Sequence, residues 1–162
     1  MTLFVSDSSV LIDLERGGLL QAAFRCEISM LVSDLLYENE LRESNGPYLM
    51  RLGLGVTSLS PDELAAAQDL QDERPALSLE DCFALICAKR ADHCLLAGDG
   101  PLGKEAAAKS VSCRGLLWLL DQMLASGKVT RTLLCEGLNQ IAQHPRCRLP
   151  RNDVDIRLSA WC

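Results

Sequence analysis

The chain of 162 residues is 48% apolar and carries a formal net charge of −6, which suits a single domain with a well-formed core. No apolar run approaches the ~20 residues of a membrane span, and no basic segment precedes an apolar run at the start. We therefore expect neither a membrane protein nor a signal peptide. The negative charge excludes a general electrostatic attraction to polyanions.

Strand and helix signals alternate along the chain, which favours a parallel α/β sheet. Apolar residues 3–5 predict a first strand, and the apolar positions of residues 10–14 predict the helix after it. Residues 28–32 predict a second strand, followed by a helix that begins near Asp34. Asp7 lies on the turn between the first strand and its helix. It suits a helix cap there, and it also suits a ligand-binding position at the carboxyl end of a strand.

The middle of the chain carries strong helix-start signals. Ser60 suits the N-cap, Pro61 the first helical position and Glu63 the partner of a capping box, so we expect a helix to about residue 72. Ser78 caps a second, well-buried helix. The remaining signals predict a strand at 93–99, an alanine-rich helix from Pro101, an edge strand at 110–115, helices near 115–125 and 130–143, and a short amphipathic tail after Pro150.

Four acidic residues fall at the same end of this predicted sheet. Asp7 and Asp99 each follow a strand, so their carboxylates meet if the two strands are neighbours. Glu38 lies one turn into the helix after the second strand, and Asp81 lies in the first turn of the helix before the strand at 93–99. Each acid has an ordinary explanation as a cap, a solvated charge or a turn residue. Their occurrence at one end of one sheet favours a shared site.

Several carboxylates in one pocket raise one another's pKa until a proton or a cation joins them. A hard divalent cation with oxygen ligands is the usual solution, and Mg²⁺ keeps bound waters for chemistry. Such a site suits attack on a phosphate, with water on the metal as the nucleophile. No histidine is placed to serve as a base instead.

Three segments together resemble the PIN domain, the family of metal-dependent nucleases that includes the VapC-like toxins of toxin–antitoxin pairs. They are VSDSSVLIDL, LVSDLLYENEL and LSLEDCFALICAKRADHCLLAGDGPLGKEA, and the resemblance covers about residues 1–110. It implies a three-layer α/β/α fold around a short parallel sheet. It further implies a ribonuclease that cleaves RNA phosphodiester bonds by metal-activated water.

The resemblance also implies roles for individual residues. One or two Mg²⁺ or Mn²⁺ ions would be held by Asp7, Glu38, Asp81 and Asp99. The hydroxyl of Ser8 or Ser9 would orient a carboxylate or a water. Many members of the family are homodimers held by an antitoxin that enters the active site, so a homodimer and an antitoxin partner are implied as well.

Two glutamates compete for the second acidic position. Glu38 and Glu40 point about 200° apart on an α-helix, so only one of them can face the site. We expect Glu38, because Leu35, Tyr37 and Leu41 fit a buried face around it better.

We expect a nuclease domain over residues 1–126 and a helical extension over residues 127–162 that packs on the same domain. Residues 1–127 carry a net charge of −9, whereas residues 128–162 carry +3. The C-terminal cations suit a local RNA-binding surface, and they equally suit a solvated rim. Arg146, Arg148 and Arg151 distinguish the two: if they line the acidic cleft, RNA is favoured.

Two other functions compete with RNA cleavage. The first is a catalytically inactive PIN-like domain that binds a protein partner. The second rests on GDGPLGKEAA, which resembles a late motif of haloacid-dehalogenase-like phosphatases. Those enzymes need a second acid where Ser9 stands and another acid three residues after Asp99, where Leu102 and Gly103 lie. The phosphatase is therefore the weaker alternative.

The eight cysteines predict neither a zinc site nor a disulfide scaffold. They form no CxxC pair, and the chain has only two histidines. We expect most of them to be small buried residues of a cytoplasmic protein. Cys162 is the exception, and we expect it to be a reactive thiol.

Overall fold

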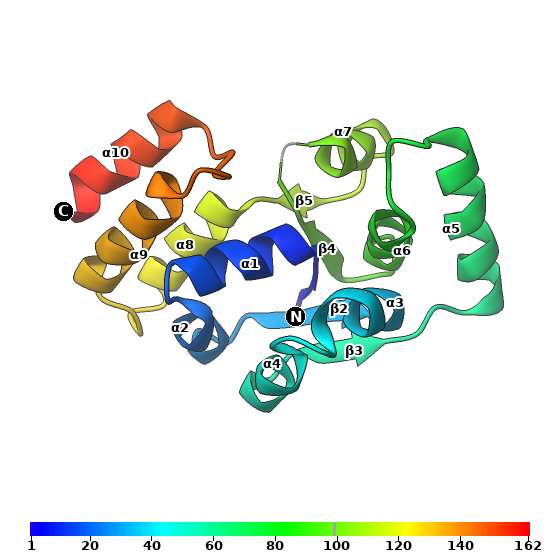
Figure 1. Cartoon of the computed structure of the whole chain (residues 1–162), viewed down its shortest axis with the longest axis horizontal. Coiled ribbons are helices and arrows are strands. Elements are labelled where there is room, and N and C mark those ends of the chain that lie inside the picture. The colour runs from blue at the N-terminus through cyan, green and yellow to red at the C-terminus, as the bar shows by residue number, and fades with distance from the viewer. Residues whose placement is uncertain (99) are drawn as a thin grey trace.

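A parallel sheet of five strands runs through the molecule in the order β3-β2-β1-β4-β5 (Figure 1). The computed structural model describes residues 1–98 and 100–162, so Asp99 lies outside the described residues. The strands are β1 (Leu3–Ser6), β2 (Ser29–Ser33), β3 (Gly55–Thr57), β4 (His93–Leu96) and β5 (Cys113–Arg114). The predicted α/β class, parallel sheet and edge strand near residue 113 are confirmed.

The central strands are buried on both faces, as parallel strands usually are. Side chains alternate between two core clusters along each strand, because successive residues of a strand point to opposite faces. In β1, Val5 joins one cluster, whereas Phe4 packs against the other. In β4, Leu95 and Leu96 divide in the same way. The sheet is therefore the middle one of three layers.

Helices cover each face of the sheet (Figure 1). One face carries α5 (Pro61–Glu73), α6 (Leu79–Ala88) and α7 (Pro101–Ala108). The other carries α1 (Ser8–Arg16), α2 (Leu20–Arg25), α4 (Gly46–Leu52), α8 (Leu116–Ala125), α9 (Arg131–Gln143) and α10 (Arg151–Trp161). Between β2 and α4 lie the short α3 (Asp34–Leu36) and a π-helical turn, η1 (Tyr37–Leu41). No described helix is long and apolar enough to cross a bilayer.

The predicted helix starts are confirmed in detail. Ser60 Oγ accepts a hydrogen bond from the Glu63 backbone N–H, and the Glu63 carboxylate accepts one from the Ser60 N–H. Ser78 caps α6 in the same reciprocal way. The elements that sequence patterns did not predict are α2, α4 and β3, all of them seven residues or shorter.

The C-terminal helices pack on the same core cluster as α1. Leu134 and Leu138 of α9 and Val154 of α10 are buried in it, as expected for an extension that packs on the same domain. The boundary at residue 126 stays a prediction.

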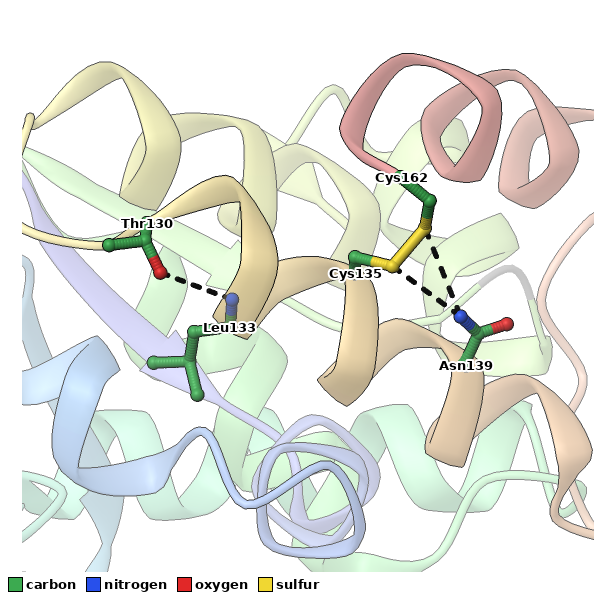
Figure 2. Close-up of a disulfide and its surroundings, with 5 residues drawn as sticks. All are labelled: Thr130, Leu133, Cys135, Asn139 and Cys162. Atoms are coloured by element: carbon green, nitrogen blue, oxygen red, sulfur yellow. Dashed lines mark hydrogen bonds between the residues drawn. A yellow bond between two sulfur atoms is a disulfide. The ribbon is translucent and has the colours of Figure 1, made fainter.

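Cys162 forms a disulfide with Cys135 of α9 (Figure 2), which corrects our expectation of a reactive thiol there and of no disulfides. The return of α10 along α9 brings the two Cα atoms to 5.6 Å, although the residues are 27 apart in sequence. Local spacing cannot reveal this approach. The expectation of buried cysteines is confirmed for Cys26, Cys82, Cys87 and Cys94.

We predict that Gly137→Ala destabilises the fold, although replacing a helical glycine by alanine usually adds about 1 kcal/mol of stability. A Cβ at position 137 of α9 would lie 2.7 Å from Leu19 Cδ1 and 2.9 Å from the Gly17 carbonyl oxygen. Relieving such overpacking costs ~1–3 kcal/mol. Chemical denaturation measures the change, with the exposed Gln140→Ala on the same helix as a near-neutral control. A gain in stability for Gly137→Ala would contradict this packing.

Candidate active site

A cleft of about 970 Å³ opens at the carboxyl end of the sheet. The register of β1 and β4 places Ser6 opposite Leu96, and the Asp7 backbone N–H donates to the Leu96 carbonyl over 2.9 Å. The two strands are thus neighbours, as the argument from the sequence required. The lining of the cleft includes Asp7 and Asp81, and also residues of the chain between α9 and α10.

Asp7 caps α1 and also lines the cleft, so the two expected roles share one side chain. Its carboxylate accepts hydrogen bonds from the Val10 N–H over 3.0 Å and from Ser9 Oγ over 2.8 and 2.9 Å. Burial nevertheless raises the pKa of Asp7, and the nearby charge of Asp81 raises it further against the effect of these hydrogen bonds. Ser9 therefore orients the Asp7 carboxylate, as proposed for a supporting hydroxyl.

Asp81 is likewise both a cap and a cleft residue. It is the third residue of α6, and its carboxylate accepts a hydrogen bond from the Ser78 N–H over 3.4 Å. The helix thus fixes the carboxylate where it lines the cleft and acts on the pKa of Asp7. Two of the predicted acids therefore meet at this end of the sheet.

Glu38 points away from these acids. Its carboxylate accepts a hydrogen bond from Arg42 Nη1 over 2.8 Å, and both side chains are more than half exposed. The reason lies in η1, where the Arg42 N–H bonds to the Tyr37 carbonyl five residues earlier. This wider turn places Leu36 and Leu41 together in the core, although they are five residues apart. The buried face that α-helical spacing predicts for residues 37–41 is therefore wrong.

Glu40, unlike Glu38, is close enough to Asp7 and Asp81 for their charges to act on it, although it lines a separate, smaller hollow with Ser8 and not the cleft itself. Partial burial and the neighbouring Glu80 raise the pKa of Glu40. The charges of Asp81 and Asp7 raise this pKa further, whereas a hydrogen bond from the Ser8 hydroxyl lowers it. Of the two glutamates, Glu40 is thus the one coupled to the acids of the cleft, and its hydroxyl neighbour is Ser8.

The acids suit a hard divalent cation, because their carboxylate oxygens are the ligands that such a cation prefers. A bound cation would also offset the repulsion between their negative charges. Asp99 lies outside the described residues. Within residues 1–98 and 100–162, no group of three or more His, Cys, Asp or Glu side chains is gathered closely enough to hold a metal. The described part of the site is thus Asp7 and Asp81, with Glu40 coupled to both.

Arginines of the C-terminal segment also line the cleft. Arg146 and Arg148 line it and form no ion pair with any described residue, and both are exposed. Arg151 does not line it, and its guanidinium lies 3.6 Å from the Asp155 carboxylate. Two of the three arginines on which the choice of function depended therefore line the same cleft as the acids. We call the segment 145–150 the basic wall.

Among the further cleft residues, Arg16 and Trp118 were not singled out from the sequence, whereas Arg157 is one of the C-terminal cations expected to suit an RNA-binding surface. Arg16, from the last turn of α1, and Trp118, from the first turn of α8, both line the cleft. Arg157 of α10 lines it while holding Asp121 through bonds of 2.9 and 2.7 Å. No local pattern marks these residues, because their shared location depends on how the helices pack.

Comparison with known proteins gives one match. Residues 3–160 match the family model described as PIN domain, which includes the C-terminal segment that the resemblance in the sequence did not reach. A search of curated proteins gave no significant match, and neither did a search of solved structures.

We predict that Asp7→Asn raises the melting temperature at pH 7 when a chelator removes divalent cations. The raised pKa means that the folded state holds a proton on Asp7 more tightly than the unfolded state does, so ionised Asp7 lowers stability at neutral pH. Asparagine keeps the shape and the capping oxygen. We expect a gain of a few degrees, since ~1 kcal/mol corresponds to about 2–4 °C in a domain of this size.

The gain should shrink as the pH falls through the raised pKa, because native Asp7 then becomes protonated. Differential scanning calorimetry over a pH series measures the difference in melting temperature between Asp7→Asn and the wild type. Asp62→Asn, in the first turn of α5, is the control for an exposed acid and should give no such gain. A lower melting temperature for Asp7→Asn at pH 7 would mean that the cap outweighs the burial of charge.

Proposed function

The chain belongs to the PIN-domain family, and on this premise we propose that it is a metal-dependent endoribonuclease. Members of this family are generally nucleases, typically with divalent metals. The observation that carries the proposal is that one cleft is lined both by the acids Asp7 and Asp81 and by Arg146 and Arg148 of the basic wall. This arrangement suits a polyanion that is cut at a metal site.

The acidic side would hold Mg²⁺ or Mn²⁺ through Asp7, Asp81 and Glu40, with Asp99 as the fourth acid that the resemblance implies. A bound divalent cation makes water a stronger nucleophile at neutral pH and offsets charge on the phosphate under attack. The protein's part is to keep the carboxylates oriented before metal arrives. The single Ser9 hydroxyl holds Asp7 through a hydrogen bond shared between the two carboxylate oxygens.

The basic wall would give an acidic chain a local positive surface on which RNA phosphates can bind. The guanidinium of arginine binds phosphate through two parallel hydrogen bonds, and it stays charged at any relevant pH. Arg146 and Arg148 are available for this, since no described acid pairs with them. The wall would place the RNA backbone against the carboxylates that line the same cleft.

An inactive PIN-like domain that binds a protein is the competing function. It requires that the acidic side bind no metal, so metal titration separates it from the nuclease. A toxin role with an antitoxin partner, and a homodimer, stay predictions from the family resemblance.

We predict that Mn²⁺ binds the wild type and that Asp7→Asn and Asp81→Asn remove this binding. Both substitutions keep the side-chain shape while removing a ligand charge. RNA cleavage should fall at least ~100-fold, since even residues that only support a metal ligand change activity by 10–100-fold. Isothermal titration calorimetry and a labelled-RNA cleavage assay measure the two effects.

The two glutamates supply a matched control for this experiment. Glu40→Gln should weaken Mn²⁺ binding, whereas Glu38→Gln, which removes only a surface pair with Arg42, should leave it unchanged. If the wild type binds no Mn²⁺ and cuts no RNA, the nuclease is wrong and the partner-binding domain takes its place.

We predict that Arg146→Ala and Arg148→Ala each weaken the binding of single-stranded RNA and flatten its salt dependence. Each lost phosphate contact reduces the slope of log K against log salt by about 0.7. Fluorescence anisotropy with a labelled RNA, in chelator to prevent cleavage, measures both quantities. Arg151→Ala is the control, because Arg151 does not line the cleft. Equal losses for all three variants would mean a diffuse charge effect and no basic wall.

A further inference from the structure

The Cys135–Cys162 disulfide closes a loop of chain that contains the whole basic wall. One sulfur belongs to α9, before the wall, and the other follows the end of α10, after it. Arg157 and Asp153 of α10, which also line the cleft, lie inside the same closed loop. The position of one side of the cleft therefore depends on how α10 is held against α9.

Apart from the disulfide, few side chains hold α10. Of its eleven residues, Val154 and Trp161 are buried and Leu158 packs half-buried against the same core cluster, whereas Ile156 is 65% exposed. No side chain caps its first turn. Arg157 contributes the ion pair with Asp121 of α8, a partly exposed contact of the kind that adds little stability. The covalent link thus adds to a small set of contacts, three apolar side chains and one ion pair, that hold this helix.

The disulfide is open to exchange with small thiols. Cys162 is exposed and Cys135 is half-buried. The Asn139 amide donates hydrogen bonds to both sulfurs, over 3.6 Å to Cys135 and 3.9 Å to Cys162 (Figure 2). Hydrogen bonds of this kind stabilise a thiolate as it leaves. Exposed disulfides are the labile and regulatory ones, in contrast to buried structural ones.

We propose that the redox state of Cys135 and Cys162 controls whether the basic wall is held in position along the cleft. The disulfide holds α10 and segment 145–150 in place along the cleft, and reduction releases them. The consequence for RNA rests on the proposed function, whereas the release itself does not.

The chemistry is thiol–disulfide exchange with a small dithiol. One thiolate of the reagent attacks the exposed Cys162 sulfur, and the S–S bond breaks with Cys135 leaving as the thiolate. The second thiol of the reagent attacks the resulting mixed disulfide, releases Cys162 and closes a cyclic disulfide. The protein gains two electrons and two protons, and the dithiol loses the same number. Oxidation reverses each step with the cyclic disulfide as oxidant.

Hydrogen–deuterium exchange measured by mass spectrometry tests the release directly, on the full chain with oxidised or reduced dithiothreitol. Alkylation of free thiols establishes which state each sample holds. We expect amides of residues 145–161 to lose protection on reduction, while α1 and α6 keep theirs. Equal protection in the two states, or thiols at 135 and 162 that stay free in oxidant, would overturn the proposal.

Binding of a labelled single-stranded RNA, in chelator, tests the consequence. Reduction should weaken binding by between about 5- and 150-fold, the usual range of coupling between two sites. The double variant Cys135→Ser/Cys162→Ser should bind weakly in both conditions. Cys113→Ser, on β5 outside the closed loop, should keep the redox response.

The two measurements separate the two proposals. Release of residues 145–161 with unchanged RNA affinity would overturn redox control of the wall. Release with no RNA binding in either state would refute the ribonuclease and uphold the redox-dependent release.

Discussion

The parallel pairing of β1 with β4 is the constraint on which the site depends. It is fixed by the backbone hydrogen bond from Asp7 to Leu96 and by the burial of Val5 and Leu95 on one face of the sheet. Because parallel strands end at the same edge, the residue after β1 must lie beside the end of β4. Helix α6 packs on this pair through the fully buried Leu85. The start of α6, and with it Asp81, therefore lies at the same edge of the sheet.

The acids of the cleft are held by the same hydrogen bonds that start their helices. Asp7 caps α1 and Asp81 completes the capping box of α6, so neither carboxylate is free to turn into solvent. Capping favours the charged form, whereas burial and mutual repulsion oppose it, and for Asp7 the second effect is larger. The fold thus keeps a partly destabilised charge where a cation would relieve it, a cost that functional sites commonly carry.

The sequence predicted those parts of the fold that depend on local signals. Serine caps, the proline at position 61 and short apolar runs marked α5, α6, β1 and β4 correctly, because each signal acts within a turn or a strand. The choice between Glu38 and Glu40 failed for a different reason. The π-turn is stabilised by burial of Leu36 and Leu41 against distant residues. No local sequence pattern within the helix predicts it. The disulfide and the cleft side of Arg146 and Arg148 depend on long-range packing in the same way.

The uneven distribution of charge along the chain has a consequence for the cleft. An overall charge of −6 repels a polyanion at long range, but salt screens exposed charges beyond a Debye length of ~8 Å at physiological ionic strength. A phosphate bound in the cleft would contact the charges of the lining directly, so for it the local pattern outweighs the net charge. The N-terminal part supplies Asp7 and Asp81 together with Arg16, and the C-terminal part supplies Arg146, Arg148 and Arg157 together with Asp153. Neither part alone forms the cleft, which makes the attachment of α10 to α9 a property of the site as well as of the fold.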